Sequence, residues 1–189
     1  MHIQKPARGY FFSSSFTLVE ILVVVSIIGL LAGLAFPAIQ GALNSAKKGK
    51  AKAEMQSIVT AVKAYQNEYG RLPIPQLDLT NDDQAYYGPE ESGSPQIFRI
   101  LAGSNVPAEL NMNMREIVFL ELPAKSTNGI FTDPWANPAA RTNNYVLKFD
   151  ANGDNIVQYS GTNYNGVVLV ISFGKDGRQN TSDDVFSFK

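Results

Sequence analysis

The sequence of 189 residues contains no cysteine and one histidine, His2. Without cysteine the chain forms no disulfide and offers no thiol nucleophile. Because no histidine follows position 2, the remaining chain cannot build a Ser-His-Asp or Cys-His catalytic site or the usual zinc sites. These two absences exclude most classes of hydrolase.

Charge of either sign is also limited, with 16 basic and 17 acidic residues and a net charge of −1. Residues 1–15 hold two of the basic residues, Lys5 and Arg8, and no acidic residue, so the rest of the chain has a net charge of −3. This balance implies no basic surface suited to nucleic acid, and we expect no nucleic-acid partner.

One long apolar stretch dominates the sequence. It runs from Phe16 to Ile39 (FTLVEILVVVSIIGLLAGLAFPAI), and its one charged residue is Glu20. A helix of this length reaches about 36 Å, enough to cross a hydrocarbon layer of ~30 Å. A soluble core helix is rarely apolar on every face for so long. The stretch therefore predicts a transmembrane helix, which Pro37 is expected to kink near its end.

The residues around the start of this stretch, Ser15-Phe16-Thr17-Leu18-Val19-Glu20, resemble the processing site of type IV pilins and of the pseudopilins of type II secretion. The resemblance implies that a prepilin peptidase removes residues 1–15 by cutting between Ser15 and Phe16, and that the new N-terminus at Phe16 is methylated. Ser15 stands where the family prefers glycine. The resemblance also implies that Glu20 assists assembly by pairing with the amine of Phe16 on a neighbouring subunit. The alternative is that Glu20 lies close enough to the interface to reach the lipid headgroups.

The helical pattern continues beyond the membrane stretch as a single apolar stripe that ends before Gly70 and Pro73. Lys47, Lys48, Lys50 and Lys52 cluster beyond the far end of the span, so the positive-inside rule by itself does not give the orientation. The family resemblance implies that the C-terminal domain lies outside the cytoplasm. The stripe consists of Met55, Ile58, Val59, Val62, Tyr65 and Tyr69.

The region 72–130 is rich in turn-forming residues and reads as loops. Two apolar patches interrupt it: residues 97–101 predict a short helix, and residues 117–120 predict a helix end or a strand. The region 131–189 predicts β structure instead. We expect the first two of its strands to form one hairpin, the last two another, and the helix stripe to cover the sheet. These strands are expected at 145–149, 156–159, 167–173 and 185–188.

Two of the connections in this C-terminal region are acidic. Asp150-Ala-Asn-Gly-Asp-Asn155 lacks the glycine and glutamate of an EF-hand and reads as a hairpin turn. The loop 173–185 crowds three carboxylates into a short segment, which on spacing alone could be a solvated turn or a Ca²⁺ site. This loop resembles the calcium loop of the major pseudopilin. The resemblance implies Ca²⁺ as a structural cofactor, held by carboxylates of Asp176, Asp183 and Asp184 and by carbonyls of Phe173, Arg178 and Thr181.

Asp133-Pro-Trp-Ala-Asn-Pro138 resembles a turn that precedes the sheet in the same pseudopilins, and we expect it to be structural. The predicted fold is α+β: a long N-terminal helix packed on a small C-terminal antiparallel sheet, as in pilins. The predicted parts are a leader at 1–15, a transmembrane half-helix at 16–39, an amphipathic half-helix at 40–71, a variable loop region at 72–130 and a C-terminal sheet with a calcium loop at 131–189.

The resemblance favours a non-enzymatic pseudopilin of a type II secretion system, a single-pass protein of the bacterial inner membrane with its head in the periplasm. The implied partners are further copies in a helical homopolymer, minor pseudopilins, the prepilin peptidase, an inner-membrane assembly platform and membrane lipid. A type IV pilin of a surface fibre for adhesion, motility or DNA uptake is the alternative. A membrane-anchored enzyme using Asp150 and Asp154 is a third class, but it would leave the long helix unexplained.

Overall fold

The structure, a computed structural model, describes residues 16–74, 83–86, 94–103, 112–123, 131–137 and 142–188. The chain forms two compact units that meet between Leu43 and Asn44. The helix α1 (Leu18–Tyr69) begins in the first unit and ends in the second. Each unit is described by itself, and the second is called the head.

The first unit is helical from Leu18 onward and continues through Pro37. Its large apolar side chains are exposed around the whole helix, from Leu18 at 81% to Leu43 at 55%. Among the described residues, α1 is the one helix long and apolar enough to cross a membrane. A helix whose apolar residues point in all directions needs lipid or other apolar helices around it, which agrees with the predicted transmembrane stretch.

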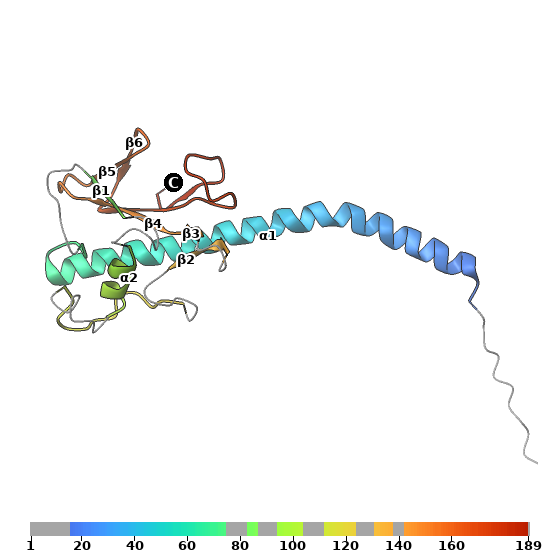
Figure 1. Ribbon diagram of the computed structural model, residues 1–189, viewed down its shortest axis with the longest axis horizontal. Coiled ribbons are helices and arrows are strands. Elements are labelled where there is room, and N and C mark those ends of the chain that lie inside the picture. Colours follow the sequence, from blue (N-terminus) through green and yellow to red (C-terminus); the bar gives the residue numbers. More distant parts are fainter. Residues whose placement is uncertain are drawn as a thin grey trace, which may run out of the picture. The chain divides into compact units, whose positions relative to one another are not determined.

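The described residues of the head form the second half of α1, one short helix and eight strands, most of which are labelled in Figure 1. Its main sheet is antiparallel, with the strand order β1-β4-β7-β8. Two smaller antiparallel pairs, β2 with β3 and β5 with β6, complete it. The elements are β1 (Asp83–Tyr86), α2 (Ser94–Leu101), β2 (Thr132–Asn137), β3 (Thr142–Asn144), β4 (Val146–Asp150), β5 (Ile156–Tyr159), β6 (Thr162–Asn165), β7 (Val168–Ser172) and β8 (Val185–Phe186).

The two central strands of the main sheet are buried on both faces. Side chains alternate along a strand, so Leu147 and Val170 join the core beneath α1, whereas Val146 and Ile171 face the opposite way. That second face is covered by the β5–β6 hairpin. All five residues of β7 are consequently buried. The covering residues of the hairpin are Val157, Tyr159 and Tyr164.

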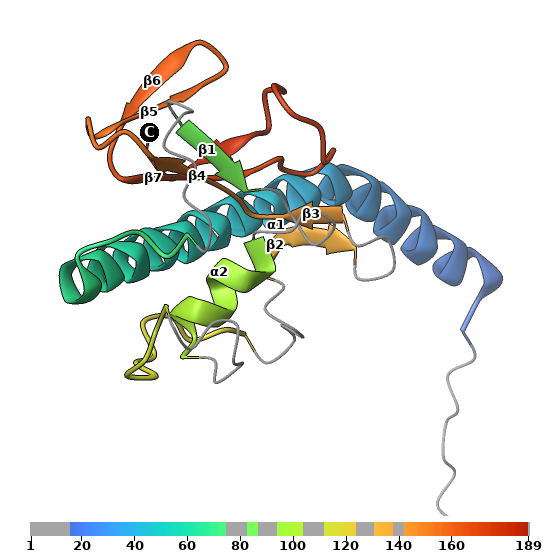
Figure 2. The same ribbon diagram turned by 60° about the vertical axis from the view of Figure 1, so that its left-hand side comes forward.

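The stripe on α1 fills the core of the head, as predicted. Met55, Ile58, Val62 and Tyr65 are fully buried. The main sheet lies on one side of this half of α1 and α2 on the other (Figures 1 and 2). The patch at 97–101 forms part of α2, as predicted, whereas the patch at 117–120 is neither helix nor strand.

The predicted hairpin between the first two strands is wrong. Strand β4 pairs with β1 and β7, and β5 pairs with β6, a strand that the sequence analysis missed. The tight turn falls at Ser160-Gly161, where both residues have positive φ, rather than at Asn152-Gly153. The expected β7–β8 pairing is confirmed.

Two segments expected to be turns or loops contain strands. Asp83–Tyr86, within the predicted loop region, forms β1 at the edge of the main sheet. Thr132–Asn137, which includes the Asp-Pro-Trp segment, forms β2, and its register with β3 shifts between Thr132 and Asn137. An edge strand and an irregular pair both tolerate turn-forming residues, because part of their backbone needs no partner.

Candidate functional site

The N-terminal candidate is centred on Glu20, which closes the first turn of α1. The Glu20 carboxylate accepts hydrogen bonds from the main-chain N–H of Thr17 at 2.9 Å and from its hydroxyl at 2.8 Å, while Glu20 N–H donates to the same hydroxyl at 3.2 Å. This reciprocal arrangement is a capping box, which satisfies donors that the first turn leaves without partners. Phe16 is 76% exposed, and Ser15 lies outside the described residues.

The second candidate is the acidic loop between β7 and β8. The carboxylates of Asp176, Asp183 and Asp184 each place one oxygen near the hydroxyl oxygen of Thr181, at 3.3, 2.8 and 3.2 Å. The carbonyl oxygen of Arg178 lies 3.2 Å from the same atom. Four of the six residues predicted as calcium ligands therefore surround the side chain of a fifth.

The Thr181 hydroxyl cannot donate a hydrogen bond to all of the oxygens around it. One hydroxyl carries one proton, and four oxygens lie within hydrogen-bonding distance of it. Other carboxylate oxygens of the loop accept main-chain N–H groups: those of Lys175 and Asp176 donate to Asp183, and that of Asn180 donates to Asp184. Over the described part of the chain, no three His, Cys, Asp or Glu side chains are arranged as a metal-binding group. The carboxylates are arranged around the Thr181 hydroxyl instead.

The two adjacent carboxyl groups of this loop have opposite environments. The Thr181 hydroxyl, helped by main-chain N–H groups, lowers the pKa of Asp183, whereas partial burial raises the pKa of Asp184. Gly174 closes the loop at a φ of +64°, and a Cβ there would lie 2.6 Å from a carboxylate oxygen of Asp183 and closer still to its carbonyl oxygen. Only glycine fits this position without a shift.

The acidic loop is tied to the core by a short relay of hydrogen bonds. The main-chain N–H of Gly174 donates to the hydroxyl of Ser172 at 3.2 Å, and this hydroxyl donates to the carboxylate of Asp133. Asp133 is 4% exposed, and its other oxygen accepts the main-chain N–H of Trp135 at 2.9 Å. Burial raises the pKa of Asp133 to about 6. The Asp-Pro-Trp segment thus supports the loop, a structural role that agrees with the prediction.

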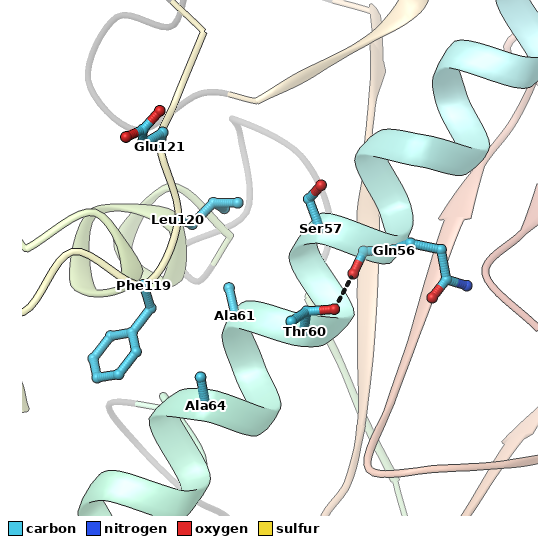
Figure 3. A pocket seen from close by; sticks show the side chains of 8 residues that line it. All are labelled: Gln56, Ser57, Thr60, Ala61, Ala64, Phe119, Leu120 and Glu121. Carbon is cyan, nitrogen blue, oxygen red and sulfur yellow. Dashed lines mark hydrogen bonds between the residues drawn. The ribbon is translucent and has the colours of Figure 1, made fainter.

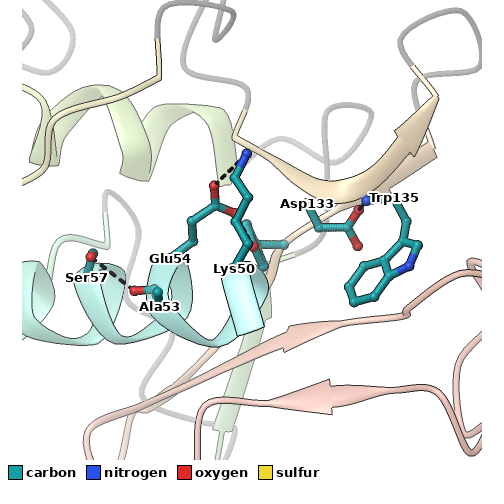
Figure 4. Close-up of polar contacts among 7 residues, drawn as sticks. Lys50, Ala53, Glu54, Ser57, Asp133 and Trp135 are labelled. Carbon is teal, nitrogen blue, oxygen red and sulfur yellow. Dashed lines mark hydrogen bonds and ion pairs between the residues drawn. The ribbon is translucent and has the colours of Figure 1, made fainter. Parts of the chain in front are cut away.

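The same segment also contacts α1 through Trp135, and Figure 4 shows Asp133 and Trp135 near the stretch of α1 that carries Lys50 and Glu54. The indole N–H of Trp135 donates to Asn44 Oδ1 at 2.9 Å. The Tyr145 hydroxyl donates to Glu54 at 2.6 Å, and Glu54 also pairs with Lys50 at 3.7 Å. These bonds fix the β2–β3 pair against the helix at the beginning of the head.

The acidic connection after β4 is a self-contained turn. The carboxylate of Asp150, 5% exposed, accepts main-chain N–H groups of Gly153, Asp154 and Asn155 at 2.7, 3.2 and 2.7 Å. Both of its oxygens are engaged, so Asp150 caps the loop and is poorly placed for acid–base chemistry.

An open groove of about 580 Å³ runs along α1 beside the segment Phe119–Glu121 (Figure 3). Its helix side is formed by small residues, among them Ser57, Thr60 and Ala64. The Thr60 hydroxyl donates to the Gln56 carbonyl oxygen at 2.8 Å, and Gln56 and Glu121 add polar side chains to the lining.

Sequence reasoning missed three contributors to the acidic loop: the Thr181 side chain, Ser172 and Gly174. Thr181 was expected to act through its carbonyl, and the loop composition gives no signal that its hydroxyl lies at the centre. Ser172 ends an apolar strand, which marks it only as a strand boundary. The Gly at position 174 is a recognisable turn signal, although its close approach to Asp183 is not.

A long helix that leads into a small head of antiparallel sheets is a pilin-like α+β architecture, as the sequence predicted. Comparison with curated proteins shows which pilin-like protein the chain is similar to. The chain is similar to type II secretion system core protein G of Pseudomonas aeruginosa, with 26% identity over 171 residues that cover 90% of this chain and 89% of the relative.

The proteins of the same name from Escherichia coli K12 and Aeromonas hydrophila are 29% and 25% identical, again over about nine tenths of both chains. The resemblance stated from the residues is thereby confirmed. No protein-family model matches the chain, and no solved structure matches it.

Proposed function

We propose that this chain is a pseudopilin, a structural subunit that assembles into the periplasmic fibre of a type II secretion system. The observation that carries the proposal is the similarity to type II secretion system core protein G along nine tenths of the chain. The apolar helix and the small head supply the two parts that such a fibre needs, one to pack in its centre and one to cover its surface.

Assembly proceeds from the membrane. The subunit spans the inner membrane once through α1, with its head in the periplasm, and the prepilin peptidase removes residues 1–15 before methylation of Phe16. The assembly platform and minor pseudopilins then direct growth of the homopolymer. Helix association inside lipid gains little from the hydrophobic effect, so close packing at Gly29 and Gly33 stabilises the fibre core. Both glycines have open space around them in the single chain.

Glu20 gives this packing its register. In the single subunit, Thr17 satisfies the carboxylate through the capping box. When Phe16 of a neighbour brings its free amine close, the opposite charges attract strongly because the surroundings are apolar. Phe16 is 76% exposed, so a neighbouring helix can approach the amine that cleavage would free at this residue.

Calcium is the structural cofactor of the head. Carboxylates of Asp176, Asp183 and Asp184 would hold it, together with carbonyls of Phe173, Arg178 and Thr181. Hard oxygen donors suit this cation, and the shortage of protons around the Thr181 hydroxyl is relieved when a cation binds the same oxygens. The bound ion would rigidify the loop and give every head in the fibre the same surface.

The enzymatic alternative has no support from Asp150, whose oxygens cap its own loop. The relatives are secretion-system core proteins by name. We therefore assign the chain a structural role.

Deletion of the gene in its own host tests the proposal. A pseudopilin is expected to be required for the release of folded proteins into the medium, and a strain with Glu20→Ala should show the same defect. Glu20→Asp, which keeps the charge, is the matched control. Normal secretion combined with lost surface fibres, adhesion or DNA uptake would instead identify a type IV pilin.

A further inference from the structure

Lysines gather where α1 leaves its apolar stretch. Leu43 is the last of the exposed large apolar residues of the helix, and four lysines follow it within nine positions. No acidic residue occurs between Glu20 and Glu54. At ~1.5 Å per residue, the lysines begin about 6 Å beyond Leu43 along the helix and end about 14 Å beyond it. A lipid headgroup layer is about 5–8 Å deep, so Lys47 and Lys48 follow Leu43 at that depth, whereas Lys50 and Lys52 need their long side chains to reach back to it. The four are Lys47, Lys48, Lys50 and Lys52.

Most of this positive charge is not neutralised within the head. Lys50 pairs with Glu54 at 3.7 Å. Among the residues that the structure describes, Lys47, Lys48 and Lys52 have no acidic partner, and Lys47 and Lys52 are exposed. Three ammonium groups are thus available to an external anion.

The sole tryptophan of the chain lies beside the part of α1 that precedes these lysines. Trp135 comes from the β2–β3 pair, is half-buried, and donates its indole N–H to Asn44, the first residue of the head. Tryptophan is enriched where membrane meets water, because its ring is apolar and its N–H is polar. Its position is an observation independent of the lysines, and it points to the same interface.

We propose that Lys47, Lys48, Lys52 and Trp135 form a juxtamembrane surface that docks on anionic phospholipid headgroups. The inference rests on the membrane placement proposed above and adds a specific lipid contact to it. The lysines attract the anionic surface within a Debye length, and their aliphatic stems lie along the apolar boundary. This contact holds the head against the bilayer until the subunit leaves the lipid for the fibre.

Lipid fits this surface better than an acidic protein partner does. At 3.6 residues per turn, the three unpaired lysines spread over about 140° of the helix circumference. A layer of mobile headgroups can reach all of them at once. A rigid partner docked on one side of the helix would leave part of the charge without a counterion.

The test uses the full chain in vesicles, with Trp135 as the fluorescent reporter. Vesicles of phosphatidylcholine alone and with about one third phosphatidylglycerol carry the same small amount of headgroup-spin-labelled lipid. We expect stronger quenching of Trp135 in the anionic vesicles, and loss of this excess near 1 M salt, where the Debye length falls to about 3 Å. The triple variant Lys47→Gln, Lys48→Gln, Lys52→Gln should lower the excess at least about fivefold.

Two control variants make the test specific. Replacing the same three lysines by arginine keeps the charge and should keep the excess quenching, and Lys63→Gln, an exposed lysine farther along α1, should not change it. Flotation of every variant with the vesicles reports membrane insertion separately, so a failure of the membrane placement is distinguished from a failure of the lipid contact.

The proposal is overturned if quenching is equal in neutral and anionic vesicles, or if the triple glutamine variant keeps the full excess. A glutamine variant that keeps its lipid response but no longer forms fibres would assign the lysines to an acidic surface of another subunit instead.

Discussion

The hydroxyl of Ser172 donates a hydrogen bond to the buried carboxylate of Asp133 and accepts one from the main-chain N–H of Gly174. One serine at the end of β7 therefore connects the β2–β3 pair to the start of the acidic loop. Through Trp135 and Asn44, the same pair is bound to α1. The acidic loop is thus linked to the helix by side chains that lie far apart in the sequence.

The buried carboxyl of Asp133 predicts a pH-dependent stability. Its pKa is about 6 in the folded chain against 3.8 for the ordinary group, so unfolding releases a proton between these values. The contribution of Asp133 to stability is fully present below about pH 4 and is lost as the pH rises through 6, an amount on the order of 2 kcal/mol. Urea unfolding in detergent, followed by Trp135 fluorescence from pH 4 to 7, measures this slope. Asp133→Asn should flatten it, and an unchanged slope would contradict the assignment.

Calcium should stabilise the head. A ligand that binds the folded state alone at 100 times its dissociation constant adds about 2.7 kcal/mol, so the melting temperature should rise with Ca²⁺ and fall with a chelator. Asp183→Ala is expected to abolish the difference. Asp154→Asn alters an exposed carboxylate in the other acidic loop and should leave it intact. Equal melting temperatures with Ca²⁺ and chelator would make the loop an ordinary turn.

Gly174→Ala should destabilise the head by at least about 2 kcal/mol, because it adds a clash with Asp183 to an unfavourable positive φ. Gly153→Ala is the matched comparison. Gly153 has a φ of +81° with open space around it, so its replacement should cost only about 1 kcal/mol. Thermal unfolding of both variants in the same detergent checks the difference, and equal effects would mean that the loop moves to accept the methyl group.

Asn113 is fully buried and makes four hydrogen bonds. Its amide group donates to the carbonyls of Ile100 and Ile117, both at 2.8 Å, and its oxygen accepts from the Tyr69 hydroxyl and the Ile117 N–H. Asn113→Ala removes all four bonds and leaves the buried carbonyl of Ile100 without this donor, so it should lower stability by about 3 kcal/mol. Asn163→Ala, an exposed position in β6, should change it by under ~1 kcal/mol in the same unfolding experiment.

Periodicity and length made much of the architecture predictable. The apolar run from Phe16 predicted a helix that the structure begins at Leu18, and the stripe through Tyr65 predicted the face that is buried. Runs of β-branched and aromatic residues located β4, β5, β7 and β8 within one or two residues. These signals are local, because each depends on the spacing of side chains along one element.

The pairing of the strands was decided only in three dimensions. The residues of each strand do not predict that β4 lies between β1 and β7. That order depends on burying both faces of the sheet, one under α1 and the other under the β5–β6 hairpin.

The features of the acidic loop also separate into those that the sequence determined and those that it did not. The sequence determined which acids crowd the loop, since Asp176, Asp183 and Asp184 are close along the chain. It did not determine that their oxygens meet at the Thr181 hydroxyl, or that Ser172 and Asp133 hold the loop to the core. The contacts at Thr181 depend on how the backbone of the loop folds, whereas the Ser172–Asp133 contact joins segments 39 residues apart, which only the packing of the whole head brings within hydrogen-bonding distance.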